Sequence, residues 1–216
     1  KTGARWRDLP KEYPSASTCW RRLRLWEERD VWLRIWRAFL SELDQRGRLD
    51  WSESFLDASF APAKKGASRS AKPAKAKVVA DGKGIPLGSQ LASAQAAEVK
   101  LAETTLEQIS VPRGGPGRPL KRLLRVIADM AYDSDALRWR LLQRGIVLIC
   151  PHRKGRCSPE PNDARTMRRY RKRWKIERTI AWLGNYRRSL VRHEHHLLLY
   201  QAFFHLACLL ITLRHL

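Results

Sequence analysis

The sequence predicts an α/β protein in which a mixed sheet is flanked by helices, and three observations lead to this expectation. After residue 49, apolar runs typical of strands are interleaved with segments of helical periodicity. Residues 1–48 instead carry two helical patterns rich in Trp and Arg. Hydrophobic residues make up 44% of the 216 residues, which is enough to build a core. We therefore expect a small, partial helical module over residues 1–48 and an α/β domain over residues 49–216.

Basic residues outnumber acidic ones two to one, and this excess indicates a polyanionic partner. Lys and Arg together number 43 against 21 Asp and Glu, so the formal net charge is +22. Nucleic acid is the simplest such partner, and an anionic membrane surface is the competing one. Charge alone does not indicate an enzyme, because a ribosomal or packaging protein would carry the same excess.

The first 48 residues predict two helices. The chain begins without an initiator Met, and we expect it to enter in the middle of a domain. Ser15 or Ser17 is suited to cap a first helix, and Asp30 to cap a second helix that ends near Gly47. The pair fits a DNA-binding or assembly module as well as it fits a helical hairpin packed on the following domain.

Strand-like segments begin after residue 51. Residues 54–60 predict a strand that carries Asp57, residues 77–80 and 85–88 predict a strand, turn and strand, and residues 90–93 predict a third strand. Residues 61–76 are low in complexity, and we expect this segment, as far as Lys77, to bind phosphates. Its candidate DNA contacts are Lys64, Lys65, Arg69 and Lys72.

Helices and strands alternate in the middle of the chain. Residues 98–109 have the apolar spacing of an amphipathic helix. Residues 123–128 predict a buried strand that delivers Asp129 at its carboxyl end. Ser134 is suited to cap the next helix, which Gly145 ends before a further strand.

Residues 165–182 contain no Pro or Gly and predict one basic helix. Tyr170, Trp174 and Glu177 recur at spacings of four and three residues, which places them on one face. Because that face is apolar, we expect Trp174 to pack in the core. A carboxylate there costs free energy unless it is paired or binds a metal. An ion pair of Glu177 with Arg173, four residues earlier, is the simpler alternative.

Two further features concern location and metal content. Residues 197–213 are strongly apolar but short for a membrane span, and they include His205, so we expect a buried core helix. The four cysteines are scattered and the chain shows no secretory signal, which favours reduced thiols in a cytoplasm. Cys150, His152 and Cys157 lack a fourth ligand at a spacing suitable for zinc.

Three acids stand out by position. Asp57 is on the first strand, Asp129 is at the end of a central strand, and Glu177 is on the late helix. Sites in α/β sheets form at the carboxyl ends of strands, and Mg²⁺ prefers carboxylate oxygens. Two such ions can hold the attacking and leaving oxygens of a phosphodiester, so the pattern indicates an enzyme that cuts nucleic acid. Alternatively, Asp57 caps a turn and Asp129 is a helix-start acid.

The remaining acids in these regions have simpler interpretations. We interpret Asp133 and Asp135 as the cap and first-turn acids of one helix. Asp50, Glu53 and Asp81 are interpreted as ordinary loop or turn acids.

The three acids lie in motifs that resemble one known family. Residues 128–134 resemble the second-acid motif of insertion-sequence transposases of the DDE superfamily, and residues 55–59 resemble its first-acid strand. Tyr170, Arg173 and Glu177 have the tyrosine–x2–arginine–x3–glutamate spacing of its third-acid signature. The resemblance is to the bacterial insertion-sequence-five family and covers practically the whole chain. Supporting stretches are residues 3–10, 81–87, 97–100, 151–153, 181–188 and 203–208.

The resemblance implies an RNase H-like core that carries out metal-dependent DNA transposition. Asp57, Asp129 and Glu177 would hold two Mg²⁺ or Mn²⁺ ions. Cleavage at the element's ends would free a 3′ hydroxyl that attacks target DNA. The implied partners are double-stranded DNA at the element ends and the target, and further copies of the chain in a homo-oligomer, but no membrane. A bacterial, cytoplasmic and nucleoid-associated location follows.

The resemblance also implies roles for basic residues. Tyr170 and Arg173 would position the third acid or contact DNA. The family often has Lys seven residues after the glutamate, where this chain has Gly184. We expect Lys175, Arg187 or Arg188 to supply the corresponding DNA contact.

Two other functions compete with a transposase enzyme. One is a catalytically inactive remnant, truncated at its amino terminus, that acts only as a DNA-binding protein. The other is a structural RNA-binding protein, which would give no reason for three carboxylates to come together.

Overall fold

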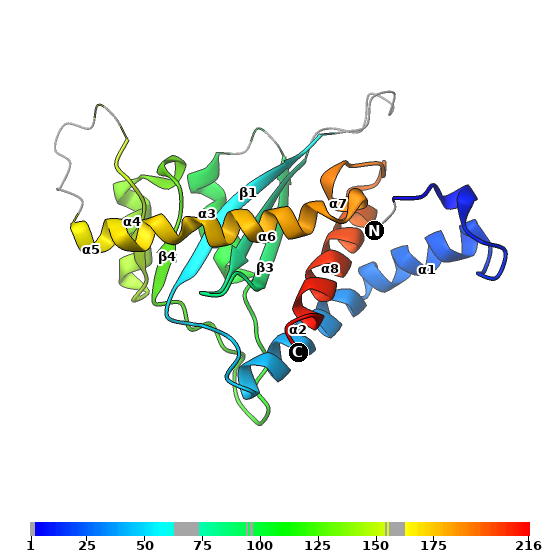
Figure 1. Cartoon of the computed structure of the whole chain (residues 1–216), viewed down its shortest axis with the longest axis horizontal. Coiled ribbons are helices and arrows are strands. Elements are labelled where there is room, and N and C mark those ends of the chain that lie inside the picture. Colours follow the sequence, from blue (N-terminus) through cyan, green and yellow to red (C-terminus); the bar gives the residue numbers. More distant parts are fainter. Residues whose placement is uncertain (1–2, 63–73, 94, 96, 154, 156–162) are drawn as a thin grey trace.

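The computed structural model describes residues 3–62, 74–93, 95, 97–153, 155 and 163–216, and a five-stranded sheet lies at its centre (Figure 1). The spatial order of the strands is β3-β2-β1-β4-β5. β1, β2 and β3 pair antiparallel, whereas β4 is parallel to both β1 and β5. This mixed sheet confirms the predicted α/β class and agrees with the RNase H-like core. The strands are β1 (Ser54–Ala61), β2 (Ala74–Ala80), β3 (Pro86–Ser93), β4 (Arg125–Ile127) and β5 (Val147–Ile149).

Helices cover both faces of this sheet. α3 (Glu98–Glu107) and α4 (Asp135–Gln143) lie on one face, and α6 (Trp174–Gly184) crosses the other (Figure 1). α3 buries Ala102 and Leu106 against the strands, as its apolar spacing predicted. The shorter helical elements are η1 (Trp6–Asp8), η2 (Met130–Tyr132), α5 (Ala164–Tyr170), η3 (Arg171–Arg173) and α7 (Arg187–Leu190).

The turn between β2 and β3 is built around a buried acid. Asp81 is fully buried, and its carboxylate accepts backbone hydrogen bonds from Asp50 at 2.8 Å, Lys83 at 2.9 Å and Ile85 at 2.7 Å. Gly84 has a φ of +89°, which L side chains rarely adopt. The interpretation of Asp81 as a turn acid is confirmed, although its full burial and its three backbone hydrogen bonds were not expected.

Two helices from the start of the chain lie one after the other along α8 (Leu197–Leu213), as Figure 1 shows. In α1 (Ala16–Glu28), Leu23 packs with Leu199 near the start of α8. In α2 (Val31–Gln45), Trp36 donates a hydrogen bond of 3.0 Å to Thr212 near the end of α8. The first helices are thus packed on the following domain, although they do not form the expected hairpin. The domain boundary at residue 48 stays a prediction.

α8 is the core helix that its composition predicted. Tyr200, Phe204 and Cys208 are all buried, at 0–2% exposure. Within the described parts of the chain, no helix combines the length and apolar character needed to cross a membrane.

Local signals were correct at some caps and wrong at others. Ser15 caps α1 by accepting a hydrogen bond from the Thr18 amide at 3.2 Å, and Ser134 caps α4 through the Leu137 amide. Asp30 precedes α2 in a left-handed conformation, and its side chain makes no capping bond. The two strands predicted over residues 85–93 form the single strand β3, since the sheet pairing continues through them.

Candidate active site

The parallel pairing of β1 with β4 relates the positions of the first two predicted acids, Asp57 and Asp129. Phe55 on β1 is in register with Ile127 on β4, and Asp57 and Asp129 each follow two residues later. The backbone of Asp129 is still extended, so the strand direction continues past the end of β4. Because side chains alternate with a period of two, this register, extended by two residues, leads us to expect the two carboxylates at the same height along the strands and on the same face.

Each of these carboxylates is oriented by a nearby backbone amide. Asp57 Oδ1 accepts a hydrogen bond from the Ala58 amide at 2.8 Å. Asp129 Oδ1 accepts one from the Ala131 amide at 2.6 Å and so caps η2. The alternative in which Asp129 is a helix-start acid therefore holds as well, and it is compatible with the position beside Asp57.

The third predicted acid lies on α6, but not on the buried face that its spacing predicted. α6 buries Ile176, Thr179 and Leu183, whereas the Glu177 side chain is 60% exposed and Trp174 is 51% exposed. The predicted single helix is interrupted by η3, where each residue advances by about 120° instead of about 100°. Within α6, the residues at helical spacing Ile176, Thr179 and Leu183 form the inward face and leave Trp174 and Glu177 outward, so the expectation of a core role for Trp174 was wrong.

Arg173 connects the first and third acids. Its Nη2 atom donates a hydrogen bond of 2.7 Å to Asp57 Oδ2 and lies 3.9 Å from Glu177 Oε1. Because both distances are measured from the same nitrogen atom, the separation of the two carboxylate oxygens cannot exceed the sum of the two distances. Burial lowers the pKa of Arg173, but the hydrogen bond and charge of Asp57 outweigh burial and raise that pKa. The expected pair of Arg173 with Glu177 is present, but the closer partner is Asp57.

The donor chemistry of this site suits a hard divalent cation. Asp57, Asp129 and Glu177 offer only carboxylate oxygens, which Mg²⁺ and Mn²⁺ prefer. The Arg173 guanidinium already places a positive charge between two of the three. No three His, Cys, Asp or Glu side chains of the described residues lie close enough together to hold one metal ion.

Glu53 is an acid whose role the sequence interpretation missed. It is 3% exposed and pairs with Arg169 at 2.5 Å and with Lys172 at 3.1 Å. These contacts fasten the basic helical segment to the start of β1. Glu53 lies in the loop directly before β1, as predicted, but its burial and its ion pairs show that it is not an ordinary loop acid.

Asp133 was also misinterpreted, because Ser134 is the cap of α4. The Asp133 carboxylate is buried and pairs with Arg138 at 3.0 Å, and it accepts a backbone hydrogen bond from Arg153 at 2.8 Å. Arg153 in turn donates 2.7 Å to the Ala131 carbonyl, within the turn that follows Asp129. Asp133 and Arg153 thus hold the carboxyl-terminal end of the turn that Asp129 caps.

A buried ion cluster lies on the sheet face opposite α6. Lys77 on β2 is 0% exposed, and its Nζ atom donates to the Glu98 carbonyl at 2.7 Å and lies 2.9 Å from the Glu98 carboxylate. Lys75 reaches the same carboxylate at 2.5 Å, and the Tyr132 hydroxyl donates to it at 2.8 Å. The expectation that the segment as far as Lys77 binds phosphates was wrong for these two lysines.

The predicted DNA contacts have different positions. Lys64, Lys65, Arg69 and Lys72 lie outside the described residues. Tyr170 is half-buried against the core. Lys175 is anchored, because its Nζ atom donates to the Gly82 carbonyl and lies 5.6 Å from the Phe55 ring centroid.

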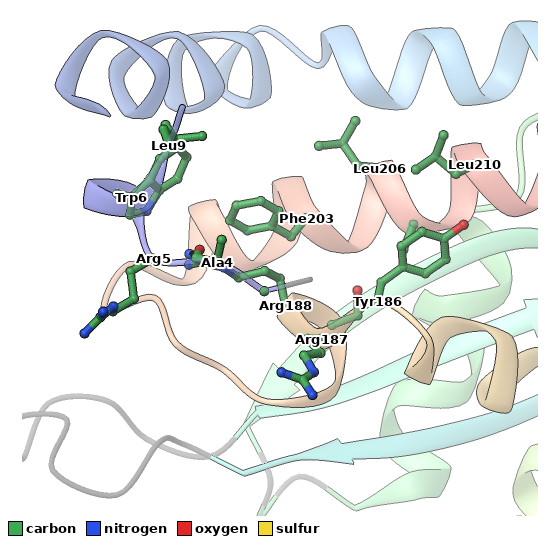
Figure 2. Close-up of a pocket in the computed structure, with 13 residues that line it drawn as sticks. Ala4, Arg5, Trp6, Leu9, Tyr186, Arg187, Arg188, Phe203, Leu206 and Leu210 are labelled. Atoms are coloured by element: carbon green, nitrogen blue, oxygen red, sulfur yellow. Dashed lines mark hydrogen bonds between the residues drawn. The ribbon is translucent and has the colours of Figure 1, made fainter. Parts of the chain in front are cut away.

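Arg187 and Arg188 are neighbours with opposite surroundings. The Arg188 guanidinium lies 5.6 Å from the Trp6 ring centroid and 5.2 Å from that of Phe203, and it pairs with Glu194. Arg187 is exposed and points away from α8 (Figure 2). Arg187 is therefore available to an outside partner, whereas Arg188 is used within the protein.

The pocket in Figure 2 lies away from the carboxylates. It has a volume of about 300 Å³ and is formed by the segment around Trp6, by α7 and by α8. Its lining includes Leu9, Leu206 and Leu210 but no residue of β1, β4 or α6.

Comparisons with known proteins match transposase families to this chain. The family described as "Transposase DDE domain" matches residues 49–212, and the family described as "Putative transposase of IS4/5 family" matches residues 1–36. The putative transposase for insertion sequence element IS402 of Burkholderia cepacia is 34% identical over 134 residues, which are 62% of this chain and 60% of that protein. The putative transposase for insertion sequence element IS6501 of Brucella ovis is 36% identical over 101 residues, which are 44% of this chain and 72% of that protein.

A second protein of the IS402 element matches over a shorter stretch. The insertion element IS402 uncharacterized 16.2 kDa protein of Burkholderia cepacia is 46% identical over 61 residues. The chain spans 60% and 42% of the lengths of the two IS402 proteins that it matches. Because the DDE domain family matches most of the chain, and the structure has the mixed sheet flanked by helices that the sequence predicted, this protein belongs to the DDE transposase family of insertion sequences.

Proposed function

We propose that this chain catalyses DNA cleavage and strand transfer for an insertion sequence, with Asp57, Asp129 and Glu177 as its catalytic acids. The observation that carries the proposal is the register of β1 and β4, which sets Asp57 level with Asp129. Arg173 supports the inclusion of Glu177, because it contacts both Glu177 and Asp57. A positively charged group between two carboxylates supports a cation site there.

The three carboxylates would hold two Mg²⁺ or Mn²⁺ ions after moving closer together, because they do not form one metal-binding group in this structure. When bound, such ions make water or a 3′ hydroxyl a better nucleophile and stabilise the leaving oxygen of a phosphodiester. The protein's part is to orient the acids, and the Ala58 and Ala131 amides do this for one oxygen of Asp57 and of Asp129. The reaction class is cleavage at the element's ends, followed by attack of the freed 3′ hydroxyl on target DNA.

The proposed partner is double-stranded DNA, at the element's ends and at the target. The net charge of +22 supports strong binding to phosphates, and exposed Arg187 is a candidate contact. Lys64, Lys65, Arg69, Lys72, Tyr170, Arg173 and Lys175 stay proposed contacts. We further propose that the chain acts on DNA as a homo-oligomer, because an element has two ends to be joined.

The test compares cleavage by variants of the three acids. Asp57→Asn, Asp129→Asn and Glu177→Gln should each lower the rate of cutting of an element-end duplex in Mn²⁺ by orders of magnitude. DNA affinity should be retained, because it depends on many separate cations. Glu107→Gln is the matched control, because that side chain is 56% exposed and pairs only loosely with Arg144, at 3.7 Å.

Two outcomes would count against the proposal. If well-folded Glu177→Gln cut DNA at nearly the wild-type rate, Glu177 would be removed from the catalytic acids. If the wild-type chain bound the duplex but cut it under none of the metal conditions, the competing function, a DNA-binding protein without catalysis, would be correct.

A further inference from the structure

The ion cluster around Lys77 is unusual for a protein core. Lys77 is 0% exposed although it lies in an apolar strand, next to Val78 and Val79. Burial lowers its pKa, even though Glu98 favours the charged form. Replacing a buried ion pair by apolar side chains is often neutral or stabilising. Stability alone therefore does not explain why a lysine and a glutamate are placed here.

The cluster is connected to the turn that carries Asp129. Tyr132 is 1% exposed and is the last residue of η2, the turn that Asp129 caps. Its hydroxyl is bonded to Glu98, and its ring lies 4.7 Å from the Lys77 ammonium. Its backbone amide donates a hydrogen bond of 3.1 Å to the Asp129 carbonyl. The Tyr132 side chain thus joins the Asp129 turn to α3 and β2.

The sheet pairing and the η2 turn place the cluster close to the first two acids. In the sheet register, Lys77 is opposite Ala58, the residue after Asp57. The cluster therefore lies behind the pair of aspartates, on the far side of the sheet from Arg173.

We propose that Tyr132, together with Lys77 and Glu98, forms a set of positioning residues that holds the Asp129 turn level with Asp57 and so sets the affinity of the site for a divalent metal. This inference rests on the proposed function only in taking Asp129 as a metal ligand. Partners that orient a metal ligand from behind typically contribute about 10–100-fold to affinity. Tyr132 is suited to this task because its side chain contacts both charged groups of the buried pair, the Glu98 carboxylate and the Lys77 ammonium.

The experiment measures Mn²⁺ binding to the whole chain by electron paramagnetic resonance of the free ion. Tyr132→Phe keeps the ring and removes only the hydroxyl bond to Glu98, and it should weaken Mn²⁺ binding on the order of 10-fold. Tyr200→Phe is the matched control, because Tyr200 is also buried and donates 2.7 Å to the Ser189 carbonyl, in a helix away from the acids. It should bind Mn²⁺ as the wild type does.

Lys77→Met gives a second test, in which the direction of the change in Mn²⁺ affinity decides between two roles of Lys77. If Lys77 acted only through its charge, its removal would favour a nearby cation, and Mn²⁺ would bind more tightly. A positioning role predicts weaker binding. Tighter binding by Lys77→Met would overturn the role of Lys77.

Asp129→Asn separates failure of this inference from failure of the proposed function. If Asp129→Asn binds Mn²⁺ as the wild type does, or if neither binds it, Asp129 is not a metal ligand and both proposals fall. If Asp129→Asn weakens binding and Tyr132→Phe does not, only the positioning role is overturned. Equal weakening by Tyr132→Phe and Tyr200→Phe would also overturn it, since the effect would then be a general loosening of the fold.

Discussion

Arg173, in η3 directly before α6, donates a hydrogen bond of 2.7 Å to Asp57 on β1. The same guanidinium lies 3.9 Å from Glu177. A side-chain cation therefore occupies the position between two carboxylates that a metal ion would need. Metal binding and the Arg173–Asp57 bond are then in competition.

We expect Arg173→Gln to increase the affinity of the DNA-free chain for Mn²⁺, because Asp57 loses its competing partner. The same change should lower the free energy of unfolding by about 1–3 kcal/mol, as expected for a hydrogen bond to a charged group. Calorimetric titration and chemical denaturation measure the two effects. Arg178→Gln is the control for lost charge, because Arg178 stacks on Trp174 at 4.9 Å instead of binding an acid. An equal increase in both variants would show that only net charge matters.

The exposed position of Trp174 leads to a second prediction, about stability. Trp174 is 51% exposed, and the Arg178 guanidinium lies 4.9 Å from its ring centroid, so Trp174→Ala should cost about 1 kcal/mol or less. Trp36→Ala is the comparison, because Trp36 is 1% exposed and bonds Thr212, and it should cost about 3–5 kcal/mol. Denaturant unfolding of both variants tests this. A loss of similar size in the two would mean that Trp174 packs in the core after all.

The order of strands and helices was predictable because it depends on local pattern. The runs around Phe55, Val126 and Leu148 are apolar over the length of a strand, and the spacing of Leu106 on its helix is that of a buried face. These patterns determine which side chains leave water, whatever the partners are. The placement of Asp57 on a strand and of Asp129 directly after one followed from the same local pattern, whereas their relative position depends on the pairing of β1 with β4.

What the sequence did not reveal depends on partners far apart in the chain. Lys77 is buried because Glu98, 21 residues later, receives it, and Glu53 is buried because Arg169, 116 residues later, pairs with it. No local sequence pattern indicates either partner. The orientation of Glu177 was missed for another reason, because the buried face of α6 is formed by Ile176, Thr179 and Leu183 and not by the face of Trp174 and Glu177.

A third prediction concerns the salt dependence of duplex binding. The logarithm of the binding constant should fall steeply with the logarithm of salt concentration, by about 0.9 per phosphate neutralised. Because Arg187 is exposed, Arg187→Gln should reduce this slope by about 1. Arg188→Gln should leave the slope unchanged, because Arg188 pairs with Glu194. Fluorescence anisotropy at several salt concentrations measures both slopes. Reversed effects would assign the DNA contact to Arg188.

The last prediction uses the pH dependence of the Glu98 cluster. Burial raises the pKa of Glu98, but hydrogen bonds from Lys75, Lys77 and Tyr132 outweigh burial and lower that pKa overall. A carboxyl whose folded pKa is lowered stabilises the protein above its unfolded pKa, which is about 4.3 for Glu. This stabilisation is fully present at neutral pH. It is lost as the pH falls below the unfolded pKa and through the lower pKa that Glu98 has in the folded protein.

Glu98→Gln should therefore melt below the wild type at pH 7, and the difference in Tm should shrink as the pH falls below about 4. The reason is that protonated Glu98 is neutral, like Gln, so acid removes the same ion pairs as the substitution. Scanning calorimetry from pH 7 to pH 3 measures the difference. Glu107→Gln, at a side chain that is 56% exposed, should show little difference at any pH. A Glu98→Gln difference that stayed constant down to pH 3 would mean that the cluster does not depend on the charge of Glu98.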